Sequence, residues 1–270
     1  MTEDNVTEAR PRWDAPKCNY RITEDGRIKA APGTEVRKIT GTTIGALMGL
    51  SPFESPFTGQ CRMLGLNDRD LSGNRAVTTG IALEPRVIDY LAAKHPDVGK
   101  FLPAETLFAE RKGNHEDWKS DWDDPDFGGH VDAIISKDGQ DYVLEIKTVK
   151  SIEHWRGEIP THYLWQVYLY NHFLTKQDKA YFGIGVVDDR DYKDPDNWQP
   201  NARNCMLVEI RIDRDMVAQE VEKMRMLRKN IQNTLTTVPC NDTAKVDADL
   251  MNHLRDYIAG KDEMLTLCQQ

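Results

Sequence analysis

The sequence predicts an α/β fold in which a central β-sheet is flanked by helices. Two β-prone apolar runs, GHVDAIIS and YVLEIKTV, are joined by Lys-Asp-Gly-Gln-Asp in the middle of the chain, and two further strand-like runs follow them. Segments with apolar residues at helical spacing stand before and after these runs. The order of helices, sheet and helices is typical of a layered α/β domain.

Composition limits the class of protein. The 270 residues suffice for one large domain, and no apolar run approaches the roughly 18 residues of a membrane span. The N-terminus lacks the basic start and apolar core of a signal peptide. The five cysteines are dispersed, which favours free thiols in a reducing compartment. We expect a cytoplasmic protein with no membrane partner.

The N-terminal part is expected to hold a hairpin and a short helix. Residues 1–36 are polar and irregular, with a short hairpin at 20–30. Thr42 or Thr43 can cap a helix that ends at Gly49. The helix carries three apolar residues on one face: Ile44, Leu47 and Met48.

A longer amphipathic helix is predicted at 79–96, with Pro85 in its first turn. Its apolar stripe consists of Val87, Ile88 and Leu91. Glu84 heads this stripe. It is either a first-turn charge that favours the helix dipole or an acid that reaches a functional site.

The remaining elements follow in regular order. They are a strand in 100–110, an acidic loop at 115–126, the two central strands, an aromatic-rich helix at 160–175, strands at 179–189 and 204–213, a charged helix at 214–235 and a short helix at 248–260. The predicted organisation is an irregular extension (1–36), one main domain (37–235) and a helical tail (236–270). Four basic residues of the charged helix either line a nucleic-acid channel or form a solvated face: Lys223, Arg225, Arg228 and Lys229.

The two central strands bring ionisable residues together. Asp138-Gly139 is a strong signal for a two-residue type I′ turn. In that register Asp132 faces Glu145, with Cβ atoms about 4.5–5.5 Å apart. Lys147 shares a face with Glu145 because side chains alternate along a strand.

Two facing carboxylates repel each other, and burial increases the cost unless a positive charge lies between them. A divalent cation with hard oxygen ligands, Mg²⁺ or Mn²⁺, removes this repulsion. Lys147 can then orient an attacking water or stabilise a developing oxyanion. The pattern indicates metal-assisted phosphodiester hydrolysis, whereas the alternative is an ordinary exposed Glu-Lys pair. Gln166 either reaches this site or is a satisfied polar group at the edge of a core.

Five motifs of this sequence resemble those of the YqaJ-like viral recombinase (bacteriophage lambda exonuclease) family of PD-(D/E)XK nucleases. In chain order they are RKITGTTIGALMGLSPFESP, TTGIALEPRVIDYL, GGHVDAII, LEIKTV and YLWQVYLY. The resemblance implies a restriction-endonuclease-like core with a central mixed β-sheet flanked by α-helices. It also implies a DNA exonuclease that acts 5′→3′ on duplex ends in phage-type recombination.

The resemblance assigns roles residue by residue. It implies that Glu84, Asp132, Glu145 and the Ile146 carbonyl hold Mg²⁺ or Mn²⁺, and that Lys147 serves the attacking water. It also implies that Gln166 steadies the site or the scissile strand. Three residues are assigned to DNA or its 5′-phosphate: Thr42, Arg37 and Tyr163. Arg37 lies close to the arginine that the family places there, but out of register with it.

The resemblance implies DNA as the partner, a single-strand annealing protein beside it, and a homo-oligomer such as a ring trimer. An iron–sulfur cluster is not expected, because no clustered cysteine spacing exists. Two other functions stay open. One is an endonuclease of restriction or defence type. The other is a non-catalytic acidic binding or inhibitor protein on the same fold, which the net charge of −9 favours.

Overall fold

The structure, a computed structural model, describes residues 20–67, 73–104, 124–153, 155, 158–234 and 236–267, with side chains through 258. These residues form two compact units. The central unit contains 38–51 and the described residues from 73 to 226, and the terminal unit contains 20–37, 52–67 and those from 227 onward. No helix in the described ranges is long and apolar enough to cross a membrane.

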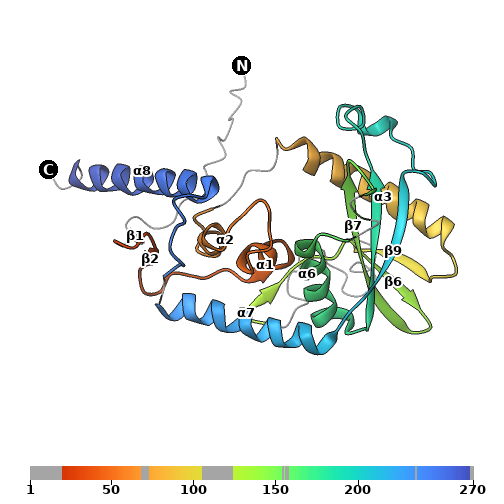
Figure 1. Cartoon of the computed structure of the whole chain (residues 1–270), viewed down its shortest axis with the longest axis horizontal. Helices are drawn as coiled ribbons and strands as arrows, with labels where there is room; N and C mark the ends of the chain where they lie inside the picture. The colour runs from red at the N-terminus through yellow and green to blue at the C-terminus, as the bar shows by residue number, and fades with distance from the viewer. Residues whose placement is uncertain are drawn as a thin grey trace, which may run out of the picture. The chain divides into compact units, whose positions relative to one another are not determined.

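The central unit is built on a five-stranded sheet with the order β4-β6-β7-β8-β9 (Figure 1). Its strands are β4 (Lys100–Pro103), β6 (Ala133–Lys137), β7 (Gln140–Val149), β8 (Lys179–Val186) and β9 (Cys205–Arg211). The β7–β8 pair is parallel and the other pairs are antiparallel. The predicted central mixed sheet flanked by helices is therefore confirmed.

Helices α3 (Arg75–Lys94) and α6 (Thr161–Tyr170) lie on opposite faces of this sheet (Figure 1). Leu144 and Ile146 of β7 join the core that α3 covers. The α3 residues of that core are Leu83, Val87, Ile88 and Leu91. Because side chains alternate along a strand, Glu145 points to the α6 face.

The start of α3 differs from the prediction. The helix begins at Arg75, because the side chain of Asn74 accepts hydrogen bonds from the N–H groups of Ala76 and Val77. Pro85 therefore lies inside the helix, not in its first turn. The first turn holds no acidic residue, so the helix-dipole interpretation of Glu84 was wrong.

A short helix, α1 (Gly41–Leu47), packs against α6. Its cap is Thr40, not Thr42 or Thr43, although Thr43 completes the capping box through its own hydroxyl. β3 (Ile39–Thr40) precedes α1 and pairs in parallel with β5 (Phe127–Gly128). A Cβ at Gly41 would lie 2.6 Å from the Tyr170 ring, so the close α1–α6 approach requires glycine there.

The connections after α6 complete the central unit. α6 continues into η2 (Asn171–Thr175), a π-helical turn, and the β8–β9 connection contains η3 (Pro195–Asn197). α7 (Arg214–Thr234) follows β9 as predicted, and its residues from 227 onward belong to the terminal unit. The strand predicted in 100–110 is β4, and residues 105–110 lie outside the described ranges.

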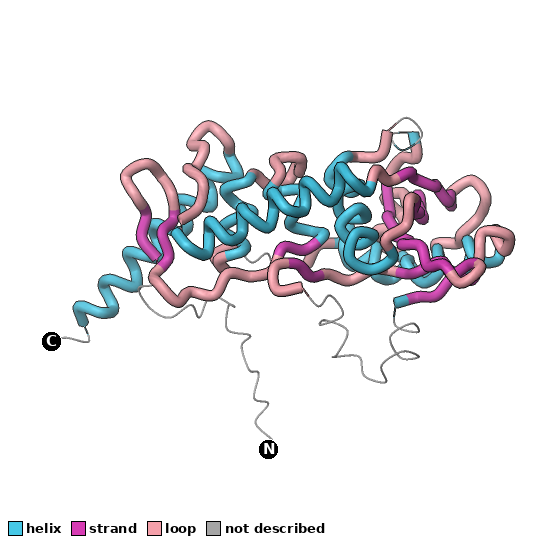
Figure 2. Tube along the Cα trace, turned by 90° about the horizontal axis from the view of Figure 1, so that it is seen from below, coloured by secondary structure: helices cyan, strands magenta, loops and turns pink. Residues whose placement is uncertain are grey.

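The terminal unit contains the predicted hairpin, β1 (Tyr20–Ile22) with β2 (Ile28–Ala30), beside the long helix α8 (Lys245–Leu267) (Figure 2). α8 is longer than the short helix predicted. A helix that was not predicted, α2 (Pro56–Met63), begins at the Ser55 cap with Pro56 in its first position. The buried Asp247 side chain accepts a hydrogen bond from the Ser55 hydroxyl and ties α2 to α8.

Candidate active site

The hairpin of β6 and β7 sets the positions of the two central carboxylates. Lys137 pairs with Gln140 and Ala133 with Leu144, so Asp132, one residue before β6, stands opposite Glu145. The turn residues Asp138 (φ 51°) and Gly139 (φ 78°) both have positive φ. These angles are those of a type I′ turn. The predicted turn and register are confirmed.

Asp132 is fixed by the neighbouring strand. Its Oδ2 atom accepts a hydrogen bond of 2.7 Å from the N–H of Ile146. The N–H and C=O of one strand residue point toward the same neighbouring strand. The Ile146 carbonyl oxygen is therefore directed to the side of β7 on which Asp132 lies.

Glu145 has one engaged and one unengaged carboxylate oxygen. Its side chain is 1% exposed. Oε1 accepts hydrogen bonds of 2.5 Å from both Lys147 Nζ and Gln166 Nε2. Oε2 is buried and has no hydrogen-bond partner within the residues that the structure describes. Buried polar atoms are nearly always hydrogen-bonded, so this oxygen marks a place where a positive group belongs.

Burial and mutual repulsion disfavour ionisation of the two acids. Burial, and then the negative charge of Asp132, raise the pKa of Glu145 to about 8, although Lys147 opposes the shift. Burial also raises the pKa of Asp132. Burial disfavours the charged form of Lys147, but the two carboxylates more than offset this and raise its pKa. The amine is therefore a cation that only partly neutralises the pair.

Helix α6 supplies two residues around Lys147 and Glu145. Gln166 donates a hydrogen bond to Glu145 Oε1, so the structure brings it to the candidate site. The Lys147 ammonium lies 5.2 Å from the centre of the Tyr163 ring. Trp155 stacks on the Tyr163 ring, with the two ring centres 5.4 Å apart. The ammonium is thus held between a carboxylate and an aromatic face.

Glu84 contributes from the opposite direction. It is half-buried on α3, and its charge adds to the effects of burial and Asp132 in raising the pKa of Glu145. The carboxylate is therefore close enough to Glu145 to influence it electrostatically. α3 brings it to the site from the middle of the helix.

The residues assigned to the DNA end come from both compact units. Thr42 is exposed on α1, and its hydroxyl lies 3.0 Å from that of Thr40. Tyr163 contacts the Lys147 ammonium. Arg37 is exposed and belongs to the terminal unit, where its N–H donates a hydrogen bond to the Met63 carbonyl.

Two basic residues of α7 do not form the predicted channel lining or solvated face. Arg225 pairs with Asp124 (2.7 Å) and Asp126 (2.6 Å) and lies over the Phe127 ring. Arg228 is buried and donates to the Val36 carbonyl at 2.6 Å. Both arginines are therefore engaged in the packing of their own units.

The donor set fits a divalent cation. In the described ranges, no three side chains of His, Cys, Asp or Glu lie close enough together to form a ready-made metal cage. Asp132, Glu145 and a backbone carbonyl nevertheless offer hard oxygen donors around the buried Oε2 of Glu145. Mg²⁺ is commonly held by one or two carboxylates and keeps several waters. The unpartnered oxygen and the repulsive pair match that mode of binding.

Comparison with known proteins finds chains of similar fold or sequence. A chain of a phage-related exonuclease from Haemophilus somnus 129PT has the same fold, with a TM-score of 0.50 and 13% identity over 74% of this chain and 95% of that one. An alkaline exonuclease from Laribacter hongkongensis aligns with a TM-score of 0.47 and 15% identity over 74% and 92% of the two chains. An uncharacterised protein of Mycoplasma genitalium is 26% identical over 72% of this chain and 80% of its own length.

A sequence profile decides the family. The profile of the YqaJ-like viral recombinase domain matches residues 33–177, which is more than half of the chain and includes Glu84, Asp132, Glu145, Lys147 and Gln166. The chain belongs to the YqaJ-like viral recombinase domain family of PD-(D/E)XK nucleases.

Proposed function

We propose that this protein is a divalent-metal-dependent exonuclease that hydrolyses linear duplex DNA from its ends, 5′→3′, in phage-type recombination. The observation that carries the proposal is the buried Glu145 Oε2 atom, which has no donor among the described residues and lies opposite Asp132. A buried carboxylate pair of this kind is costly unless a cation joins it. The phage-related exonuclease neighbour has the same fold.

Asp132, Glu145, Glu84 and the Ile146 carbonyl are the residues that would hold Mg²⁺ or Mn²⁺. When bound, the cation would neutralise the carboxylates and polarise the scissile phosphate. Lys147 would orient the attacking water and keep its own proton at Nζ, because the adjacent carboxylates raise its pKa. Gln166 would hold Glu145 Oε1, and Tyr163 would hold the ammonium in place.

Several finer assignments belong to the same proposal. Thr42 would contact the 5′-phosphate at the DNA end, and Tyr163 would lie beside the bound strand. Arg37, a residue of the terminal unit, would contact DNA as a separate element. The nuclease domain would span 37–235, between the extension at 1–36 and the tail at 236–270. The protein would act in the cytoplasm, beside a single-strand annealing protein and as a homo-oligomer such as a ring trimer.

The test is a cleavage assay on linear duplex DNA with 5′-phosphate or 5′-hydroxyl ends and on a closed circle, each with Mg²⁺ or EDTA. We expect loss of the linear substrates only, in Mg²⁺ only, and faster loss of the phosphorylated ends. Asp132→Asn should abolish cleavage because it removes one of the paired oxygen donors. Asp97→Asn, an exposed acid of the same unit, is the matched control and should retain activity.

Each contrary result points to a definite alternative. Cuts in the closed circle would replace the exonuclease with an endonuclease of restriction or defence type. Absence of cleavage in every substrate, with Asp132→Asn and the wild type alike, would leave a non-catalytic acidic binding protein. Thr42→Val tests the end-binding assignment separately, since it should remove the preference for phosphorylated ends without abolishing cleavage.

A further inference from the structure

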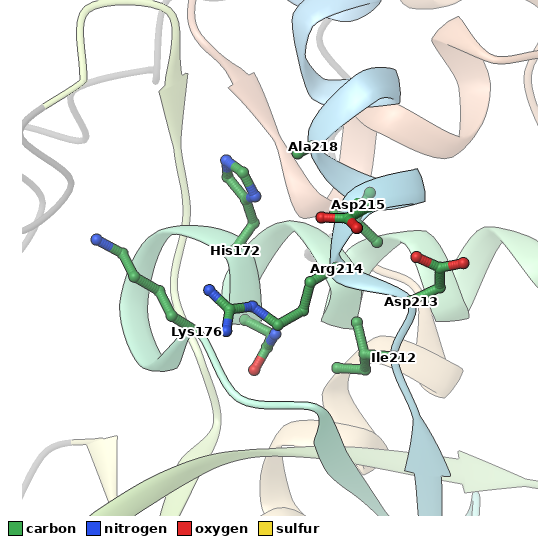
Figure 3. Close-up of a pocket in the computed structure, with 9 residues that line it drawn as sticks. His172, Lys176, Ile212, Asp213, Arg214, Asp215 and Ala218 are labelled. Atoms are coloured by element: carbon green, nitrogen blue, oxygen red, sulfur yellow. The ribbon is translucent and has the colours of Figure 1, made fainter.

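A cavity of about 710 Å³ lies in the central unit where η2 and the residue after it meet the start of α7 (Figure 3). None of the residues of the candidate active site lines it. Its volume is within the range of roughly 300–1,000 Å³ that is usual for small-molecule sites. The floor includes the buried side chains of Ile212 and Val217, and the wall includes His172, Lys176 and Arg214.

The charges in the cavity are separated. Figure 3 shows His172, Lys176 and Arg214 on one side and Asp213 and Asp215 on the other. Asp213 is engaged, because its Oδ1 accepts a hydrogen bond from the Met216 N–H. Lys176 and Arg214 form no ion pair with any residue that the structure describes. One wall of the cavity is therefore cationic in a chain whose net charge is −9.

The electrostatics at His172 agree with this picture. Burial lowers the pKa of His172, and the positive charges of Lys176, Arg225 and Arg214 lower it further, against the opposite effect of Glu222. A group whose protonation is disfavoured by surrounding cations lies in a positive potential. Such a potential attracts an anion.

The Asn171 side chain ties the residues on both sides of Lys176. The buried Asn171 side chain donates to the Gln177 carbonyl (2.9 Å) and accepts from the Thr175 hydroxyl (2.6 Å) and the Gln177 N–H (3.1 Å). Lys176 has φ 56° and ψ 31°, a left-handed conformation in which helix ends usually place glycine. Glycine would adopt this backbone conformation with less strain than lysine does. The backbone conformation is therefore not the reason for a lysine at position 176.

We propose that this cavity binds the phosphate of a nucleotide unit, held by Arg214, Lys176 and His172, with the sugar or base against Ile212 and Val217. The source is either a DNA strand that passes the active site or a free mononucleotide. Only the choice of a nucleotide as ligand rests on the proposed function. His172 follows Gln166 by six residues on one continuous helical segment, which joins the cavity to the candidate active site.

The binding test uses the full chain in EDTA, where cleavage does not interfere, and a fluorescent oligonucleotide whose anisotropy reports affinity. Arg214→Ala and Lys176→Gly should each weaken binding about tenfold at 0.1 M salt and lower the slope of log affinity against log salt by about 0.7–0.9. The matched controls are Arg203→Ala and Lys193→Ala, which remove exposed cations of the same unit outside the cavity. Lys176→Gly should melt at the wild-type temperature or above, because glycine suits that backbone.

A second readout separates the two sources. The imidazole NMR signals of His172 are followed as dAMP, the oligonucleotide or inorganic phosphate is added. A response to the oligonucleotide together with the loss of affinity identifies a DNA strand, and a response to dAMP alone identifies a mononucleotide; both support the site. Unchanged His172 signals with every ligand, and variants that bind DNA like the controls, would overturn it. Neither readout requires catalysis, so a failure of the nuclease assay leaves this test intact.

Discussion

Lys147→Met is expected to slow DNA hydrolysis about 10³-fold while leaving the affinity for DNA nearly unchanged. The methionine replaces the aliphatic stem of the lysine with an unbranched stem of similar length but removes the ammonium that lies 2.5 Å from Glu145 Oε1 and faces the Tyr163 ring. In the proposed function that ammonium would act on the attacking water and the developing charge, which are present only during the reaction. The expected change is therefore in kcat and not in KM.

The measurement is single-turnover cleavage of end-labelled duplex in saturating Mg²⁺, with DNA affinity measured separately in EDTA. The matched control is Lys150→Met. Lys150 is an exposed lysine just after the same strand, and it forms an ion pair with Asp189. It should cleave at nearly the wild-type rate. A Lys147→Met protein that retains more than a tenth of the wild-type rate would exclude the lysine from the chemistry.

Glu145→Gln is expected to abolish cleavage and, in EDTA at pH 8 or above, to raise the melting temperature by a few degrees. In the wild type the raised pKa of about 8 means that the native state keeps a proton which the unfolded state has already released. The stability that the native state gains by keeping this proton on Glu145 is therefore lost as the pH rises from about 4.5 to about 8. The amide has no charge to bury but still accepts the hydrogen bond from Gln166.

The wild type and Glu145→Gln should differ in their response to Mg²⁺. The ion should raise the melting temperature of the wild type, since it binds the native state, and should have little effect on Glu145→Gln. Glu153→Gln, an exposed glutamate in the same region, is the control and should behave as the wild type. A Glu145→Gln protein that melts below the wild type in EDTA would mean that the carboxylate is stabilising without a metal.

The paired acids could be predicted because their arrangement depends on local rules. The Asp138-Gly139 turn fixes the hairpin register, and the register places Asp132 opposite Glu145. Lys147 then follows from the alternation of side chains. The contact from Gln166 crosses to another element, so the sequence pattern left it open between two alternatives.

Other features depend on contacts between distant residues and escaped prediction. Arg225 and Arg228 looked like part of a charged helix face, but their partners Asp124 and Val36 are about 100 and 192 residues away in the chain. The start of α3 was missed because an interior Pro85 was taken as a first-turn residue, although Asn74 offers a cap earlier. The Ser55-Pro56 pair is typical of a helix start, since Ser55 caps α2 and Pro56 is its first residue, but the sequence prediction did not include this helix.

Mn²⁺ binding tests the central claim most directly, because Mn²⁺ replaces Mg²⁺ at oxygen sites and its free form is seen by electron paramagnetic resonance. Titration into the wild type should show depletion of the free signal by at least one site per chain. The Glu145→Gln protein should bind at least tenfold more weakly, and Glu153→Gln should match the wild type. Equal Mn²⁺ binding by the wild type and Glu145→Gln, or none by either, would contradict the metal site and the hydrolysis that depends on it.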